Sequence, residues 1–270
     1  MSSQAYDVLM DRLAELMVTA VQHRTTAVHA YWLLLTETVQ HGHPLTPFTL
    51  GDLLQHGRAD ATLPAWAQPL APAALGCLLQ HGEWFDTSLP PWPSRHALLL
   101  WTDLLPYRDT PLQWVGTSTP YVDELWEQVR RLWHAVCTLY GPGSPASTAL
   151  PEEVWRGVVL FDAGLYFACH EYFETLWGRT DDVASDFYQG LIQIAVAMRH
   201  LESHNVRGAL ILLRYGIGRL QRYPAVYKGV AVARFRAQLE SLLATLDALP
   251  NPSTYQFDPA HVPRLFGTII

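Results

Sequence analysis

Positive charge is scarce in this chain, and lysine is nearly absent. The 270 residues include a single lysine, Lys228, and 18 Lys and Arg together against 25 Asp and Glu, so the net charge is −7. A protein devoted to nucleic acid needs a positive surface to neutralise phosphates, so we do not expect such a partner. Only 16% of the residues are charged and 49% are hydrophobic, which excludes a disordered chain.

Cysteines are also few, and long apolar runs are missing. Cys77, Cys137 and Cys169 lie far apart and form no CxxC pattern, which favours free thiols in a reducing compartment. The N-terminus has no basic segment followed by an apolar one, so we expect no export signal. Apolar runs such as 97–101 fall far short of the roughly 20 residues that span a bilayer. We therefore expect a soluble cytoplasmic protein that does not enter the membrane.

The first half of the chain alternates between helical periodicity and proline-rich sequence. Residues 4–40 repeat apolar positions three and four apart, which predicts one long or two consecutive helices. Eleven of the 19 prolines fall within 44–120, which excludes long helices and extensive central strands there. A further helix is predicted from Thr119-Pro120 to Tyr140. We expect residues 1–145 to form a Trp- and Pro-rich helical region, whose role the sequence does not indicate.

A weak internal repeat lies in the proline-rich part. Residues 51–57 and 76–82 share the pattern Leu-Leu-Gln-His-Gly, and each predicts a short helix that ends at its glycine. His56 and His81 are expected to interact with the last carbonyls of these helices.

The second half predicts a compact helical bundle. A Gly-, Pro- and Ser-rich linker precedes residues 146–250, and the proline-rich residues 251–270 predict an irregular tail. The first helix of the bundle either continues to Trp177 or breaks near Gly164. Ser185-Asp186 and Asn205 are the expected caps of the next two helices, and the last helix is expected to cover about 226–249. No alternating strand pattern of useful length exists, so the fold class is all-α and multi-helical.

One local excess of positive charge lies between Arg199 and Arg236. It contains eight cations and a single acid, Glu202. The simpler interpretation is a solvated basic face that balances the acidic remainder of the chain. The alternative is a contact with an anion or a partner.

Four polar residues stand out on two nearly apolar helical segments. His170 and Glu174 lie four residues apart on the first segment, and Gln189 and Gln193 lie four apart on the second. Consecutive helices with a short connection usually pack together, so we expect these groups to meet in a seam that is at least partly buried. Buried polar groups require hydrogen-bonding partners.

Three interpretations of this cluster remain open. It is a structural network that sets the helix pairing, or a ligand or catalytic site, or a metal site. In a catalytic site His170 would act as acid or base and Glu174 would orient it. Small-ligand contacts would come from the polar and aromatic side chains nearby, namely Gln189, Gln193, Tyr166, Trp177 and Glu171. The metal interpretation stays open, but we assign no metal ligands from the sequence. The reasons are that Glu174 replaces the second His of His-Glu-x-x-His and that neighbouring helices offer few carboxylates.

The central stretch resembles the bacterial and plastid domain-of-unknown-function family 309. The matching motifs are Phe161-x-x-Gly-x-Tyr-Phe-x-x-His-Glu-x-x-Glu-x-x-Trp177, Phe187-Tyr-Gln-Gly-Leu-Ile-Gln193, Gly208-Ala209 with Leu212-Leu213, and Tyr223-Pro-x-x-Tyr-x-Gly229. The resemblance covers about residues 155–245 and leaves the first 150 residues outside. It implies a compact helical bundle with the His, Glu and Gln residues as its signature, and it implies no activity, cofactor or partner.

From the sequence we therefore expect a cytoplasmic helical-bundle protein whose buried His/Glu/Gln cluster is structural or binds a small polar ligand. The alternatives are a hydrolase-like or metal-assisted enzyme that uses His170 and Glu174, and a protein-interaction scaffold that uses the Trp-rich N-terminal region. The sequence names no cofactor, and it leaves open whether the protein forms a homo-oligomer.

Overall fold

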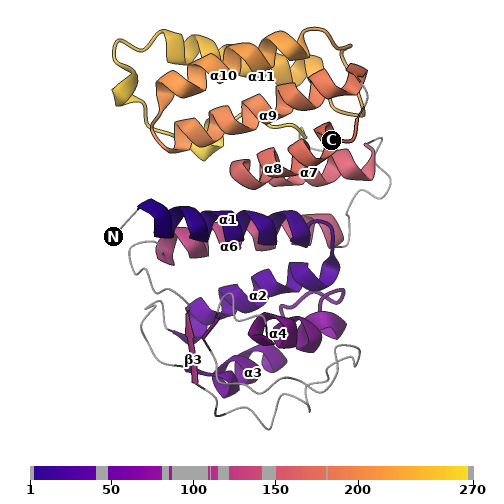
Figure 1. The fold of residues 1–270 in the computed structure, drawn as a ribbon, viewed down its shortest axis with the longest axis vertical. Helices are drawn as coiled ribbons and strands as arrows, with labels where there is room; N and C mark the ends of the chain where they lie inside the picture. The colour runs from indigo at the N-terminus through magenta and orange to yellow at the C-terminus, as the bar shows by residue number, and fades with distance from the viewer. Residues whose placement is uncertain are drawn as a thin grey trace. The chain divides into compact units, whose positions relative to one another are not determined.

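The computed structural model describes residues 3–40, 48–80, 85–86, 109, 111–114, 122–141, 150–180 and 182–266. The described chain is helical, as predicted, and it divides into two compact units, Met1–Pro142 and Gly143–Ile270 (Figure 1). No helix in the described ranges combines the length and the apolar character needed to cross a membrane.

The N-terminal unit is built around α2 (Arg24–Val39), which packs against α1 (Ser3–Ala20), α3 (Leu50–Ala59), α4 (Ala71–Gln80) and α6 (Val122–Tyr140). The predicted periodicity of residues 4–40 thus corresponds to two helices. On α2 the side chain of Trp32 is fully buried, and its Nε1 donates a hydrogen bond to the carbonyl oxygen of Ala71 at 2.9 Å. Trp126 on α6 is also buried, so these two tryptophans are core anchors.

Three short strands in this unit were not predicted. They are β1 (Phe48–Thr49), β2 (Phe85–Asp86) and β3 (Pro111–Trp114), joined antiparallel in the order β1-β3-β2. Strands of this length are too short to produce an alternating pattern in the sequence.

The repeat glycine Gly57 does not end its helix, because α3 continues to Ala59. A Cβ atom on Gly57 would stand 2.3 Å from Cη2 of Trp32, so glycine is needed here for close packing of α3 on α2. His56 does contact a carbonyl of its own helix, since its Nδ1 lies 2.8 Å from the oxygen of Asp52. His81, Gly82 and Thr119-Pro120 lie outside the described residues.

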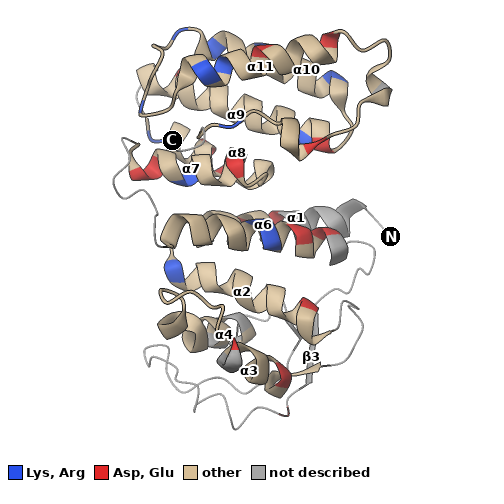
Figure 2. Ribbon diagram, turned by 180° about the vertical axis from the view of Figure 1, so that it is seen from behind, with Lys and Arg blue, Asp and Glu red and all other residues tan. Residues whose placement is uncertain are grey.

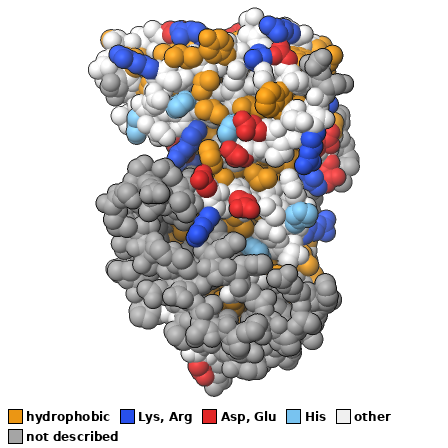
Figure 3. All heavy atoms as spheres, viewed as in Figure 1, with side chains coloured by type: hydrophobic (Ala, Val, Ile, Leu, Met, Phe, Trp, Pro, Cys, Tyr) orange, Lys and Arg blue, Asp and Glu red, His pale blue; other side chains and the backbone are white. Residues whose placement is uncertain are grey.

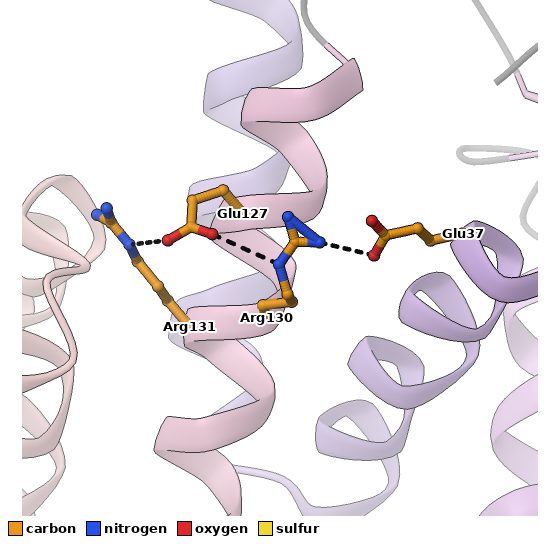
Figure 4. A network of polar contacts seen from close by, with 4 residues as sticks. All are labelled: Glu37, Glu127, Arg130 and Arg131. Atoms are coloured by element: carbon orange, nitrogen blue, oxygen red, sulfur yellow. Dashed lines mark hydrogen bonds and ion pairs between the residues drawn. The ribbon is translucent and has the colours of Figure 1, made fainter. Parts of the chain in front are cut away.

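An ion-pair network joins α2 to α6 (Figure 4). Arg130 contacts Glu37 of α2 at 2.6 Å and Glu127 of its own helix at 3.4 Å, and Glu127 also pairs with Arg131 at 3.0 Å. These side chains are partly solvent-exposed, so the network orients α6 on α2 and adds little free energy.

The C-terminal unit consists of consecutive helices that pack on their neighbours. They are α7 (Glu152–Asp162), α8 (Tyr166–Trp177), α9 (Asp182–Glu202), α10 (Val206–Leu220) and α11 (Val232–Asp247), followed by the 3₁₀ turns Pro252–Thr254 and Pro259–His261. The chain breaks between α7 and α8, where Gly164 has a φ of 78°. Asn205 caps α10 as predicted, because its side chain accepts a hydrogen bond from the N–H of Gly208.

Two predicted helix starts are wrong. Helix α9 begins at Asp182, so Ser185-Asp186 lies inside its first turns, where Asp186 pairs with Arg219 and Arg222. Helix α11 begins at Val232 and not near residue 226, because the chain first makes a turn in which Lys228 and Gly229 have positive φ angles.

The C-terminal tail is fixed to the end of α7 by Asp162. The two carboxylate oxygens of Asp162 accept hydrogen bonds from the backbone N–H groups of Leu265 and Phe266 at 2.8 and 2.9 Å. Phe266 also packs edge-on against Trp155 of α7. Residues 251–266 therefore cover part of the bundle although they contain no α-helix.

Most cations of the basic stretch 199–236 face carboxylates. Arg199 pairs with Glu202, Arg214 with Asp247, Arg219 and Arg222 with Asp186, and Arg236 with Glu240. This pairing favours the predicted charge-balanced face over a site for a free anion.

Candidate functional site

Helix α8 has one buried face and one polar face. Tyr166, Ala168, Cys169, Tyr172 and Phe173 are buried in the bundle. The opposite side carries three polar side chains with relative exposures of 19% for His170, 43% for Glu171 and 46% for Glu174. The expected buried seam is therefore open to solvent on its α8 side, because α8 buries only one face.

His170 lies between two carboxylates. Its Nε2 is 3.1 Å from Oε1 of Glu174, one helical turn away, and this contact is a hydrogen bond. Its Nδ1 is 3.2 Å from Oε1 of Glu171, yet Nδ1 is buried and makes no hydrogen bond with the described part of the chain. The predicted pair of His170 and Glu174 is thus in contact, and Glu171 joins it.

These three side chains bring three possible metal-ligand atoms close together. One nitrogen of His170 and one oxygen from each glutamate lie within 4.8 Å of one another. Donor atoms on a single metal ion stand roughly 3 to 4 Å apart, so small rotations of the exposed glutamates would suffice. No Lys or Arg pairs with Glu171 or Glu174 in the described ranges. The charged residues of α8 are all acidic, and its ribbon is red at these positions and tan elsewhere (Figure 2).

The second helix of the predicted cluster, α9, packs against α8. Gln189 and Gln193 are both partly buried on it. The amide oxygen Oε1 of Gln193 is buried and accepts no hydrogen bond from the described residues. No direct hydrogen bond joins His170 to either glutamine in the described part of the chain, so the expected four-residue network is not formed directly.

The two aromatic candidates have different environments. Tyr166 is only 4% exposed and packs edge-on against Phe161 and Phe257, so it is part of the core. Trp177 is 38% exposed and its Nε1 donates to Oγ of Ser185 at 2.7 Å. Tyr166 is therefore not available to a ligand at the surface, whereas Trp177 is.

Two tyrosines in the surrounding core remain neutral hydrogen-bonding groups. Burial raises the pKa of Tyr172 and that of Tyr188 to about 12. Neither phenol is therefore a source of charge near α8 at neutral pH.

The sequence predicted Glu171 as a contact of a small ligand, but it did not predict that Glu171 lies beside Nδ1 of His170. Residues i and i+1 of a helix do not usually face each other, so the sequence offers no signal for this contact. Glu171 reaches Nδ1 because the imidazole lies along the helix surface with one nitrogen toward each carboxylate.

Comparisons with known proteins give two partial matches. A protein of Aquifex aeolicus (strain VF5), described as an uncharacterized protein, is 23% identical to this chain over 99 residues, which is 36% of this chain and 29% of the relative's length. The chain thus spans less than a third of that relative. No solved structure matches the chain. Residues 154–212, from α7 into α10, match the family model "Domain of unknown function (DUF309)", which confirms the resemblance expected from the sequence for this segment.

Proposed function

We propose that the bundle of residues 146–250 is a ligand-binding module and that its ligand is a divalent metal ion held at His170 and Glu171. The supporting observation is the contact between Nδ1 of His170 and Oε1 of Glu171, which are 3.2 Å apart without a hydrogen bond between them. A bare imidazole nitrogen and a carboxylate oxygen both present lone pairs, so they repel each other unless a cation lies between them.

The other side of the imidazole supports the same proposal. Metal-binding histidines usually donate their second ring N–H to a carboxylate, which fixes the tautomer and the ring orientation. Glu174 is placed for this role, since it accepts from Nε2 at 3.1 Å. Glu174 is then the orienting residue that the sequence suggested, while Glu171 is the second metal ligand.

The donor set indicates the class of metal. One imidazole nitrogen and carboxylate oxygens suit zinc, manganese, cobalt or iron(II). Because Glu171 is 43% exposed, water would complete the coordination shell. An open coordination position is also what metal-assisted catalysis requires, so the metal-assisted enzyme remains the second candidate.

A purely structural role for the cluster predicts a different chemical state. In that case a second proton would make His170 an imidazolium held by two carboxylates, and no metal would bind. The alternative scaffold function could use only some of the tryptophans described in the N-terminal unit, since Trp32 and Trp126 are buried while Trp66 and Trp133 are partly buried. We place the module in the cytoplasm, supported by free thiols at all three cysteines.

The experiment is metal binding to untagged, chelator-treated protein. Zinc is titrated calorimetrically, and cobalt(II) is titrated by visible absorption, which reports its coordination directly. We expect one ion per chain for the parent protein and none for His170→Ala. His261→Ala is the matched control, because His261 also pairs with a carboxylate, Asp258 at 2.7 Å, but with no second carboxylate among the described residues.

Two results would contradict the proposal. One is a parent protein that binds neither zinc nor cobalt at ligand concentrations well above the protein concentration. The other is equal binding by His170→Ala, which would place the metal elsewhere.

A further inference from the structure

One face of helix α10 is exposed to solvent and carries large apolar side chains. Ile211 is 54% exposed and Tyr215 is 63% exposed, although apolar side chains of this size are usually buried. They share this side of the helix with other exposed residues at spacings of three and four, and together we call them the α10 outer face: Arg207, Ile211, Arg214, Tyr215, Gly218 and Arg222.

The arginines of this face outnumber the carboxylates that pair with them. Helix α10 contains no acidic residue. Arg214 and Arg222 reach carboxylates at its edges, on Asp247 and Asp186, while Arg207 has no carboxylate partner in the described part of the chain. Figure 3 shows hydrophobic side chains that reach the surface of the C-terminal unit among both basic and acidic side chains.

Gly218 on this face has no internal explanation. A Cβ atom at Gly218 would meet nothing within 4 Å, so neither packing nor a turn requires glycine there. Glycine within a helix costs about 1 kcal/mol relative to alanine. Because Gly218 has no side chain, a partner molecule could come close to the backbone of α10 beside Tyr215.

We propose that the α10 outer face docks an acidic amphipathic helix of a partner protein. Positions 207, 211, 214, 215 and 218 lie on one side of the helix, as a helix-on-helix contact requires, and Ile211 and Tyr215 are its apolar anchors. The apolar centre would bury Ile211 and Tyr215, and acidic residues of the partner would meet Arg207 and Arg214 at the rim. This inference does not depend on the metal site, which lies on α8.

Charge distinguishes this partner from a second copy of the chain. A two-fold contact between two α10 helices would bring the same surface together twice, with arginines of one copy facing those of the other. Like charges across an interface oppose association, whereas an acidic helix is complementary.

The test uses a fluorescent synthetic peptide of about four helical turns, with leucines at intervals of three and four and glutamates at the remaining positions. Its twin has lysine at each glutamate position. We expect saturable binding of the acidic peptide to the full chain and no binding of the lysine twin. Arg207→Glu, and the double change of Ile211→Ser with Tyr215→Ser, should each weaken binding at least about tenfold.

Matched controls are available on the same unit. Val183 is 69% exposed and Arg234 is exposed on α11, so Val183→Ser and Arg234→Glu repeat each change outside the six residues of this face. All substituted residues are exposed, so the fold should persist, and circular dichroism would verify this.

The proposal fails if the acidic peptide does not bind, if both peptides bind equally, or if the variants bind like the controls. It also fails if sedimentation shows a dimer that Ile211→Ser dissociates, since the occupant would then be a second copy. Binding of the parent protein to anionic phosphatidylserine vesicles that is lost in the same variants would instead assign the face to a membrane.

Discussion

Ile194 of α9 occupies the space in which a side chain on Gly216 of α10 would begin. A Cβ atom on Gly216 would stand 2.7 Å from Cγ1 of Ile194 and 3.0 Å from the carbonyl oxygen of Gly190. Gly216→Ala would force the two helices apart, which costs more than the gain in helix propensity. We expect a loss of about 1 to 2 kcal/mol in the free energy of unfolding, measured by urea denaturation.

The matched change two residues away should have the opposite sign. Gly218 is exposed on the same helix with nothing within 4 Å of an added Cβ atom. Gly218→Ala should therefore raise the free energy of unfolding by about 0.5 to 1 kcal/mol. If both variants shifted stability in the same direction, the packing of α10 on α9 would not be as described.

Asp162 should make the stability of the C-terminal unit depend on pH between about 4 and 6. Burial raises the pKa of Asp162 from 3.8 to about 6, although the N–H groups of Phe266 and Leu265 and the Arg264 guanidinium oppose this. The folded state then holds a proton that the unfolded state releases near pH 4. Stability from this group is complete below pH 4 and is lost as the pH rises through 6, by about 2 to 3 kcal/mol.

Asp162→Asn isolates this effect, because it keeps a carbonyl oxygen but cannot ionise. Urea denaturation of both proteins at several pH values gives the difference in unfolding free energy, to which other titrating groups contribute equally. The parent should lose stability relative to the variant as the pH rises from 4 to 7. A difference that stays constant over this range would contradict the assignment.

In the N-terminal unit, a helix cap should matter more than a salt bridge. Thr49 and Asp52 form a capping box, in which the N–H of Thr49 donates to Oδ2 of Asp52 at 2.6 Å. Thr49→Ala should cost about 1 kcal/mol. Arg130→Ala should cost about 0.5 kcal/mol, because the ion pair with Glu37 is partly in solvent: the Arg130 side chain is 42% exposed and the Glu37 side chain is 29% exposed. Equal thermal shifts for the two variants would show that the network in Figure 4 is stronger than its exposure implies.

Helix ends that depend on local chemistry could be predicted from the sequence. The break at Gly164, where φ is positive, is one of the two alternatives that the sequence left open, and the cap at Asn205 is a hydrogen bond to the N–H three residues away. Errors arose where a distant residue decides the role. Gly57 looked like a helix end but fits against Trp32, and Asp186 looked like a cap but pairs with Arg219 of α10 and with Arg222 just after it.

The candidate site was predictable to the same extent. The spacing of His170 and Glu174 predicts their contact, because residues four apart share a helix face. The exposure of Glu174 was not predictable, since it depends on α8 having only one face against its neighbours. The contact of Glu171 with Nδ1 depends on the rotamer of the imidazole, which no sequence pattern records.

The roles of the two glutamates can be separated by their neutral isosteres. If Glu171 is a metal ligand, Glu171→Gln removes its charge at the metal and should abolish zinc binding. If Glu174 only orients the ring through Nε2, Glu174→Gln should retain a site whose affinity is lower by about 10- to 100-fold. Calorimetry gives both affinities, and ¹⁵N chemical shifts of His170 report which ring nitrogen holds the proton. In the zinc-loaded parent protein the proton should be on Nε2, because Nδ1 is the metal-binding atom. A proton on Nδ1 with zinc bound would mean that Glu174, not Glu171, is the metal ligand. Equal losses of zinc affinity in the two variants would mean that both glutamates have the same role.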